Sequence, residues 1–82
     1  MIIRTQNKKD IVDVIRVSIS HKLGIVNKVV IIGYYRSIAL LFNNTVTLGI
    51  YNEKDAMEEM DKIHSFFIGN PNSIYQMSEF KF

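Results

Sequence analysis

Two histidines and a pair of adjacent glutamates are the side chains of this sequence best suited to acid–base or metal chemistry. His21 and His64 are its only imidazoles, and neither belongs to a spacing such as H-x-x-x-H that would supply a second metal ligand. Glu58 and Glu59 are consecutive, so on a helix they point about 100° apart and do not form a paired-carboxylate site. We therefore predict that both glutamates face solvent and that His64 lies at the edge of a buried helix face, with no catalytic or metal role.

The rest of the sequence shows no other recognisable set of catalytic residues. It has no cysteine, which excludes disulfides, thiolate nucleophiles and zinc sites that use cysteine. Its four glycines are dispersed, and no Gly-rich phosphate loop, G-x-S-x-G or H-E-x-x-H motif is present. We predict a protein that is not an enzyme and holds no cofactor and no metal; a hydrolase or transferase is the least favoured alternative.

Residues 29–42, "VVIIGYYRSIALLF", are the most apolar stretch, with Arg36 as their only charge. A membrane-spanning helix needs about 20 apolar residues, so this stretch is too short to cross a bilayer. Its β-branched and aromatic residues favour strands instead. One strand of this length would extend for about 46 Å, beyond the usual range, so we expect a bulge at Gly33 or a break near Arg36.

Alternation and turn residues predict the other strands. Ile2 and Ile3 form a short first strand, and Ile15, Val17 and Ile19 alternate with polar residues as one face of the next. "HKLG", residues 21–24, then turns the chain into the apolar stretch. Asn43-Asn44 predicts a tight hairpin that sets Leu41 opposite Val46, with Val46, Leu48 and Ile50 on one core face.

The segment that follows has the pattern of an amphipathic helix from about Glu53 to Ile68. Asn52 is a suitable N-cap, Gly69 a suitable C-cap, and Pro71 prevents continuation. The predicted buried stripe consists of Ala56, Met57, Met60, Ile63, His64 and Phe67. A short strand in "SIYQMS", residues 73–78, ends the pattern. Residues 1–82 are thus predicted to be a single α+β domain: an antiparallel β-meander of five or six strands, open or closed into a partial barrel, packed on one helix.

Apolar side chains on both faces of the predicted sheet indicate a partner. One helix covers one face, and period-two geometry directs alternate residues of the 29–42 stretch to the other. An uncovered apolar face usually binds another protein, and self-association into a homodimer is the simplest solution. The predicted contact residues are Tyr34, Tyr35, Arg36, Leu40 and Phe42. The alternative is a sheet that curls and buries this face against itself.

The charge distribution leaves single-stranded nucleic acid as a second candidate partner. Residues 1–52 carry seven Lys or Arg against Asp10 and Asp13, about +5, whereas residues 53–82 carry six acids against three lysines, about −3. A basic sheet with exposed tyrosines can stack bases, although the basic-Gly-aromatic-Gly pattern of RNA-recognition modules is absent. We therefore keep nucleic-acid binding as the alternative function.

Three segments resemble a known group of proteins. "MIIRTQNKKDIV", "TVTLGIYNEKDAMEEMDKI" and "SIYQMSE" are similar to small uncharacterised proteins of Gram-positive bacteria and their prophages or plasmids, which open with a Thr-Gln-Asn/Asp-Lys turn. Their closing Tyr-x-Met-Pro-Glu strand differs here, because Ser78 replaces the proline. The resemblance covers about half of the residues, implies a bacterial α+β protein, and supplies no activity. Together with an opening segment that lacks a secretory h-region, it leads us to expect a cytoplasmic location.

Overall fold

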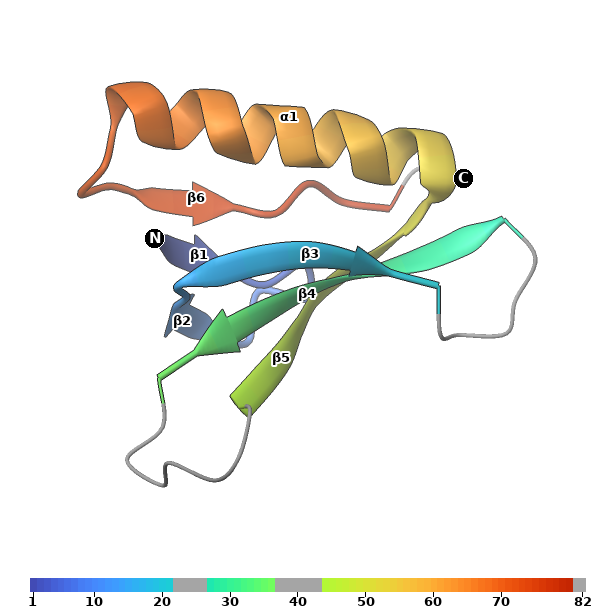
Figure 1. The fold of residues 1–82 in the computed structure, drawn as a ribbon, viewed down its shortest axis with the longest axis horizontal. Helices are drawn as coiled ribbons and strands as arrows, with labels where there is room; N and C mark the ends of the chain where they lie inside the picture. The colour runs from blue at the N-terminus through green and yellow to red at the C-terminus, as the bar shows by residue number, and fades with distance from the viewer. Residues whose placement is uncertain (22–26, 37–43, 81–82) are drawn as a thin grey trace.

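The computed structural model describes residues 1–21, 27–36 and 44–80, which form one helix and two three-stranded sheets (Figure 1). The strands are β1 (Ile2–Arg4), β2 (Ile11–Asp13), β3 (Arg16–Ser20), β4 (Lys28–Tyr35), β5 (Asn44–Asn52) and β6 (Ile74–Gln76), and the helix is α1 (Glu53–Gly69). One sheet has the order β2-β1-β6 and the other β3-β4-β5. All neighbouring strands are antiparallel except β1 and β6, which are parallel.

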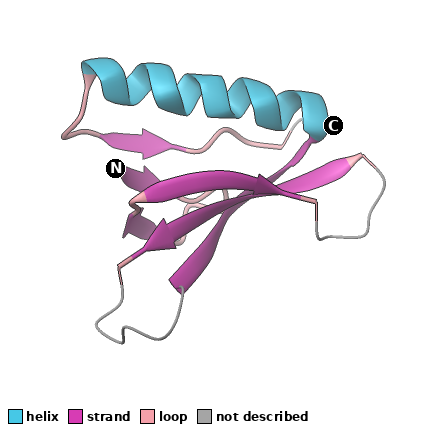
Figure 2. Cartoon of the chain, viewed as in Figure 1, coloured by secondary structure: helices cyan, strands magenta, loops and turns pink. Residues whose placement is uncertain are grey.

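The predicted α+β class is confirmed: the described residues contain one helix, in the second half of the sequence, and a short strand after it (Figure 2). The strands divide into two sheets, and within the described residues neither sheet closes on itself. The division falls between Asp13 and Arg16, where the chain leaves β2 and enters β3. The prediction that Ile15 shares the buried face of Val17 and Ile19 is wrong: Ile15 lies at this junction and is exposed, whereas the other two pack against the core.

The β4–β5 hairpin pairs different residues from those predicted. Val46 lies opposite Gly33, and Asn44 lies opposite Tyr35, whereas Leu41, the predicted partner of Val46, lies outside the described residues. The prediction rested on the similar apolar patterns of the short segments before and after Asn43-Asn44. In the structure the pairing joins strands 28–35 and 44–52, which are long and therefore form many ladder hydrogen bonds. The break near Arg36 is consistent with β4 ending at Tyr35, and residues 37–43 lie outside the described residues.

A bulge in β5 changes which side chains enter the core. Ile31 pairs with Gly49 and Ile32 with Thr47, so Leu48 is the extra residue. Leu48 and Tyr51 are consequently both buried, although they are three positions apart. The prediction that Ile50 belongs to the core face is wrong, because the bulge reverses the alternation and leaves Ile50 exposed. The bulge was expected at Gly33, in β4, whereas the extra residue lies in β5, opposite the step from Ile31 to Ile32.

The core lies between α1 and the inner faces of the two sheets (Figure 1). Its buried apolar members are Ile3, Val14, Val29, Ile31, Leu48, Tyr51, Ala56, Ile63, Tyr75 and Met77. Gly33 allows close packing here, since a Cβ at that position would lie 2.7 Å from Cγ1 of Val14. Within residues 1–21, 27–36 and 44–80, no helix is long and apolar enough to cross a membrane.

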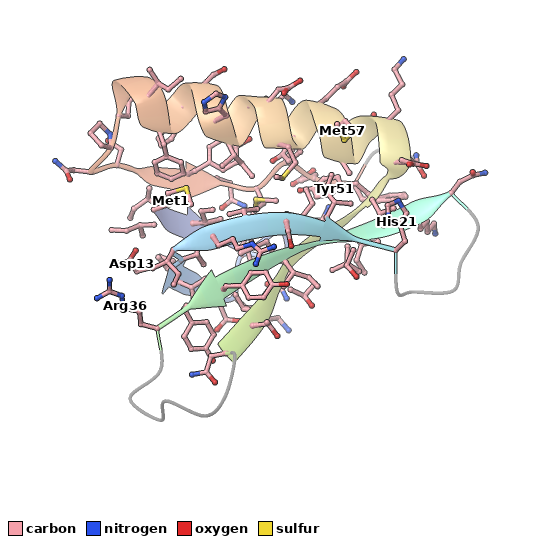
Figure 3. All side chains as sticks on the ribbon, viewed as in Figure 1. Met1, Asp13, His21, Arg36, Tyr51 and Met57 are labelled. Atoms are coloured by element: carbon pink, nitrogen blue, oxygen red, sulfur yellow. The ribbon has the colours of Figure 1, made fainter. Side chains whose placement is uncertain are left out.

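The buried face of α1 differs in part from the predicted stripe. Ala56 and Ile63 are buried, and Met60 and Phe67 pack against the core, as predicted. Met57 and His64 are exposed, so their assignment to the stripe is wrong; Figure 3 labels Met57 on α1. The buried face instead includes Glu59, which contradicts its predicted exposure. The helix extends through Gly69, and Asn70 caps it by donating its N–H to the carbonyl of Phe66 at 2.9 Å.

Candidate functional site

Exposed apolar side chains from separate segments surround one hollow on the surface. It has a volume of about 480 Å³ and is lined by Ile11, Val12, Asp13, Ile15, Tyr35 and Arg36; we name it the β2–β4 hollow. Ile11 is 57% exposed, Ile15 61% and Tyr35 36%. Three large apolar groups in one open depression form a concentrated apolar patch, which is the usual property of a contact surface.

The local backbone determines why these side chains meet. Alternation along β2 turns Val12 toward the core and leaves the side chains of Ile11 and Asp13 outside. The N–H of Ile15 donates to the carbonyl of Tyr34 at 2.8 Å, which fixes the β2–β3 junction beside the end of β4. Tyr35 and Arg36 are the next residues along that strand end, so they line the same hollow.

Two opposite charges stand at the rim of the hollow. Asp13 accepts a hydrogen bond from the Met1 ammonium at 3.2 Å, and both groups are solvent-accessible. Arg36 makes no ion pair with any residue that the structure describes. Figure 3 shows Asp13 and Arg36 at the same end of the molecule. The hollow therefore combines apolar side chains with one guanidinium and one carboxylate.

The five predicted contact residues do not occupy one surface. Tyr35 and Arg36 both line the β2–β4 hollow. Tyr34, the neighbour of Tyr35 in β4, points to the opposite face of the sheet, where the Arg16 guanidinium lies 4.9 Å from its ring centroid. Leu40 and Phe42 lie outside the described residues. The sequence pattern did not predict Ile11 and Ile15 as contact residues. The strand that ends at Asp13 has three residues, which is too short to be recognised by alternation.

The face of the β3-β4-β5 sheet that is turned away from α1 has a different character; we name it the outer face. The strand register places on it three residues of β3 (Arg16, Ser18, Ser20), four of β4 (Lys28, Val30, Ile32, Tyr34) and four of β5 (Thr45, Thr47, Ile50, Asn52). These residues include two cations and no acid. The Lys28 ammonium lies 5.2 Å from the ring centroid of Phe80.

A buried carboxylate, Glu59, lies at the centre of a polar network beside the core. Oε2 of Glu59 accepts a 2.9 Å hydrogen bond from the Tyr75 hydroxyl and a 2.8 Å hydrogen bond from the Ser78 N–H. The Tyr51 hydroxyl donates to the Ser78 carbonyl. Burial is the main cause that raises the pKa of both Tyr51 and Tyr75 above the usual tyrosine value, and the negative charge of Glu59 adds to it.

This network connects elements and has no room for a substrate. The cavity beside Tyr51, Glu59 and Ser78 has a volume of about 10 Å³, which is about the space of one water molecule. Its hydrogen bonds join α1 to β6 and to the segment after β6, and they join that segment to β5. The sequence signal for it was present, since Glu59 has helical spacing with Ala56 and Ile63, but an acid next to Glu58 is more typical of a solvated face.

The remaining candidates for chemistry do not form a site. His21 lies 3.4 Å from Glu53 on the exposed surface, and His64 is exposed on α1. Among the residues of the three described ranges, no group of three His, Asp or Glu side chains is placed to hold a metal ion. Comparison with family models, curated proteins and solved structures finds no match to this chain. Function is therefore inferred from the residues and their geometry.

Proposed function

We propose that this protein is a small non-enzymatic interaction module that associates with a second copy of itself through the β2–β4 hollow. The observation that supports this most directly is the gathering of Ile11, Ile15 and Tyr35 around one open depression. Covering these side chains removes apolar surface from water, which is the main favourable contribution to protein association. Tyrosine and arginine, both present here, are enriched at contact surfaces.

A second copy is the partner that the charges favour. The rim carries one carboxylate, Asp13, and one guanidinium without an ion-pair partner in the described structure, Arg36. A two-fold axis brings the same patch of each copy together, so a surface with both signs of charge can complement itself. As part of this proposal, the protein comes from a bacterium or a mobile element, as the resemblance of its sequence implies.

The oligomeric state in solution tests this function. We expect sedimentation velocity or light scattering to show a dimer that dissociates on dilution, and Ile15→Lys to be a folded monomer, because a charge at the hollow cannot be buried without a partner. Ile68→Lys is the matched control, since Ile68 is also an exposed isoleucine but lies on α1 and does not line the hollow. A wild-type protein that is monomeric at every attainable concentration would exclude the proposal.

A second candidate function, binding of single-stranded nucleic acid, is supported by the outer face. Arg16 and Lys28 lie there among serine and threonine hydroxyls without an acid, as phosphate contacts require. Against it, the Arg16 guanidinium covers a face of the Tyr34 ring, which reduces the surface on which a base could stack. Titration with an oligonucleotide at two salt concentrations, with the Arg16→Ala, Lys28→Ala double variant as control, tests this function: binding that weakens with salt and is lost in the variant supports it.

A further inference from the structure

We infer that the two copies join by antiparallel pairing of their β2 edges, with a two-fold axis at Val12. This inference rests on the proposed self-association and identifies the backbone segment that forms it. It would fuse the two β2-β1-β6 sheets into one continuous sheet across the dimer. The exposed Ile11 side chains of both copies would then be covered at the centre of the contact.

The hydrogen bonds between β1 and β2 show which backbone groups of β2 face outward. The Val14 N–H donates to the Met1 carbonyl at 2.8 Å, and the Met1 ammonium donates back to the Val14 carbonyl at 3.1 Å. At the other end the Thr5 N–H donates to the Asp10 carbonyl at 2.9 Å. Hydrogen-bonded and non-bonded pairs alternate in an antiparallel ladder. Since Ile2 lies opposite Asp13 and Arg4 opposite Ile11, these two are non-bonded pairs, and the N–H and C=O groups of Ile11 and Asp13 point away from β1.

The edge of β2 has the features of a strand that accepts another strand. Among the described strands it is the last of its sheet, and the β2–β4 hollow lies beside it. Protective devices at sheet edges include lysine, other charged side chains, proline, a bulge and a very short strand. β2 has no lysine, proline or bulge and carries an exposed isoleucine, although it is only three residues long and includes Asp13. An open edge of this kind is typical of segments that bind by strand addition.

The edge of β5 shows how this protein closes an edge that is not used. The side-chain amide of Gln6 bonds both backbone groups of Ile50: Oε1 accepts from its N–H at 3.0 Å, and Nε2 donates to its carbonyl at 3.0 Å. The backbone N–H of Gln6 also donates to the Leu48 carbonyl at 2.8 Å. The outward groups of β5 at these positions are thus already bonded, whereas among the described residues no hydrogen bond is formed to the outward groups of Ile11 and Asp13.

The outward groups of β2 are complementary to themselves. Antiparallel pairing with Val12 opposite Val12 of the second copy places Ile11 opposite Asp13 in both halves of the contact. Each of these pairs can exchange N–H to C=O bonds in both directions, as hydrogen-bonded antiparallel pairs do. No carboxylate lies directly opposite another, and each Asp13 keeps its own Met1 ammonium as counter-charge. A register shifted by one residue would bring inward-facing backbone groups to the contact and lose these bonds.

Introduced cysteines test the pairing, because the sequence has none of its own. In the proposed register the two Val12 residues are a non-bonded pair, whose Cα atoms lie about 4.5 Å apart, within the range of a disulfide. We expect Val12→Cys to form a covalent dimer rapidly under mild oxidation, as seen by non-reducing electrophoresis. Ile74→Cys, on the opposite edge strand β6, and Ser18→Cys, on the edge strand β3, are the matched controls and should remain monomeric.

The outcomes separate the two proposals. A wild-type dimer in which Val12→Cys does not cross-link, or in which Ser18→Cys cross-links instead, overturns the β2 pairing and leaves self-association standing. A wild-type monomer excludes both.

A second pair of variants gives the answer if Val12→Cys fails to fold. Asp13→Pro removes the outward N–H, whereas Asp13→Ala keeps it, and both lack the carboxylate. Proline is tolerated at an edge whose N–H faces outward, so we expect a folded monomer for Asp13→Pro and a dimer for Asp13→Ala. If Asp13→Pro and Asp13→Ala dimerise to the same extent, the inference is contradicted.

Discussion

The hydroxyl of Tyr75 donates a 2.9 Å hydrogen bond to Oε2 of Glu59, a side chain that is only 2% exposed. The Ser78 N–H donates to the same oxygen, so one carboxylate on α1 holds both β6 and the segment that follows it. A buried carboxylate is costly unless hydrogen bonds compensate its lost hydration, and these two bonds supply that compensation. Glu59 therefore stabilises the fold, and the first two predictions concern this carboxylate and the buried tyrosines beside it.

Removing the acceptor at position 59 should destabilise the protein strongly. Glu59→Leu preserves much of the volume but leaves the Tyr75 hydroxyl and the Ser78 N–H without an acceptor, and we expect a loss of about 2–4 kcal/mol in the free energy of unfolding. Glu59→Gln keeps a carbonyl oxygen and should lose about 1 kcal/mol. Urea denaturation measures both. Glu58→Leu is the control on the exposed neighbour, with an expected change within about 0.5 kcal/mol. Equal stability of Glu59→Leu and wild type would contradict the structural role.

The two buried tyrosines should make the fold sensitive to alkaline pH. Burial raises the pKa of Tyr51 and Tyr75 in the folded state, so the unfolded state loses these protons first. Below about pH 10 both states keep the protons and neither tyrosine contributes a pH dependence; above it, the free energy of unfolding should fall as pH rises. Denaturation curves from pH 8 upward, with tyrosinate absorbance as a second signal, measure this effect. Tyr75→Phe should reduce the slope, and a flat profile in the wild type would contradict the prediction.

The close approach at Gly33 should make that position intolerant of a methyl group. A Cβ there would lie 2.7 Å from Cγ1 of Val14 and 3.2 Å from Cδ1 of Leu48, so side chains in the core must move. We expect Gly33→Ala to lower the free energy of unfolding by about 1–3 kcal/mol. Gly69→Ala is the control, because nothing lies within 4 Å of its Cβ position at the end of α1, and this variant should be neutral or more stable by up to about 1 kcal/mol. If the two variants behave alike, the packing argument fails.

Local periodicity was sufficient for the elements that depend on near neighbours. The bounds of α1, with Ala56 and Ile63 inside, follow from helical spacing and from Pro71 after the helix. The bulge at Leu48 and the change of sheet after Asp13 depend on pairing between distant strands, which a pattern over a few residues does not contain. The burial of Glu59 depends in the same way on Tyr75 and Ser78, which lie 16 and 19 residues further along the chain, in the next strand and just after it.

The candidate site was predicted only in part for the same reason. An apolar strand end with Tyr35 and Arg36 indicated a contact surface, and both residues line the β2–β4 hollow. The remaining apolar groups, Ile11 and Ile15, reach it because the Ile15 N–H bonds the Tyr34 carbonyl across the two sheets. That bond is a tertiary contact, so the full set of residues appears only once the strands are placed.

The last prediction concerns the side chain that closes the edge of β5. Gln6 bonds both backbone groups of Ile50 and donates to the Ser78 carbonyl at 3.3 Å, so it ties the β1–β2 loop to the second sheet and to the segment after β6. Gln6→Leu should leave the Ile50 groups to water, lower the free energy of unfolding by about 1–3 kcal/mol and accelerate amide exchange at Ile50. Gln6→Glu keeps the acceptor for the Ile50 N–H but loses both donated bonds, so it should protect that amide better than Gln6→Leu does. Hydrogen exchange that is unchanged at Ile50 in Gln6→Leu would show that another group protects this edge.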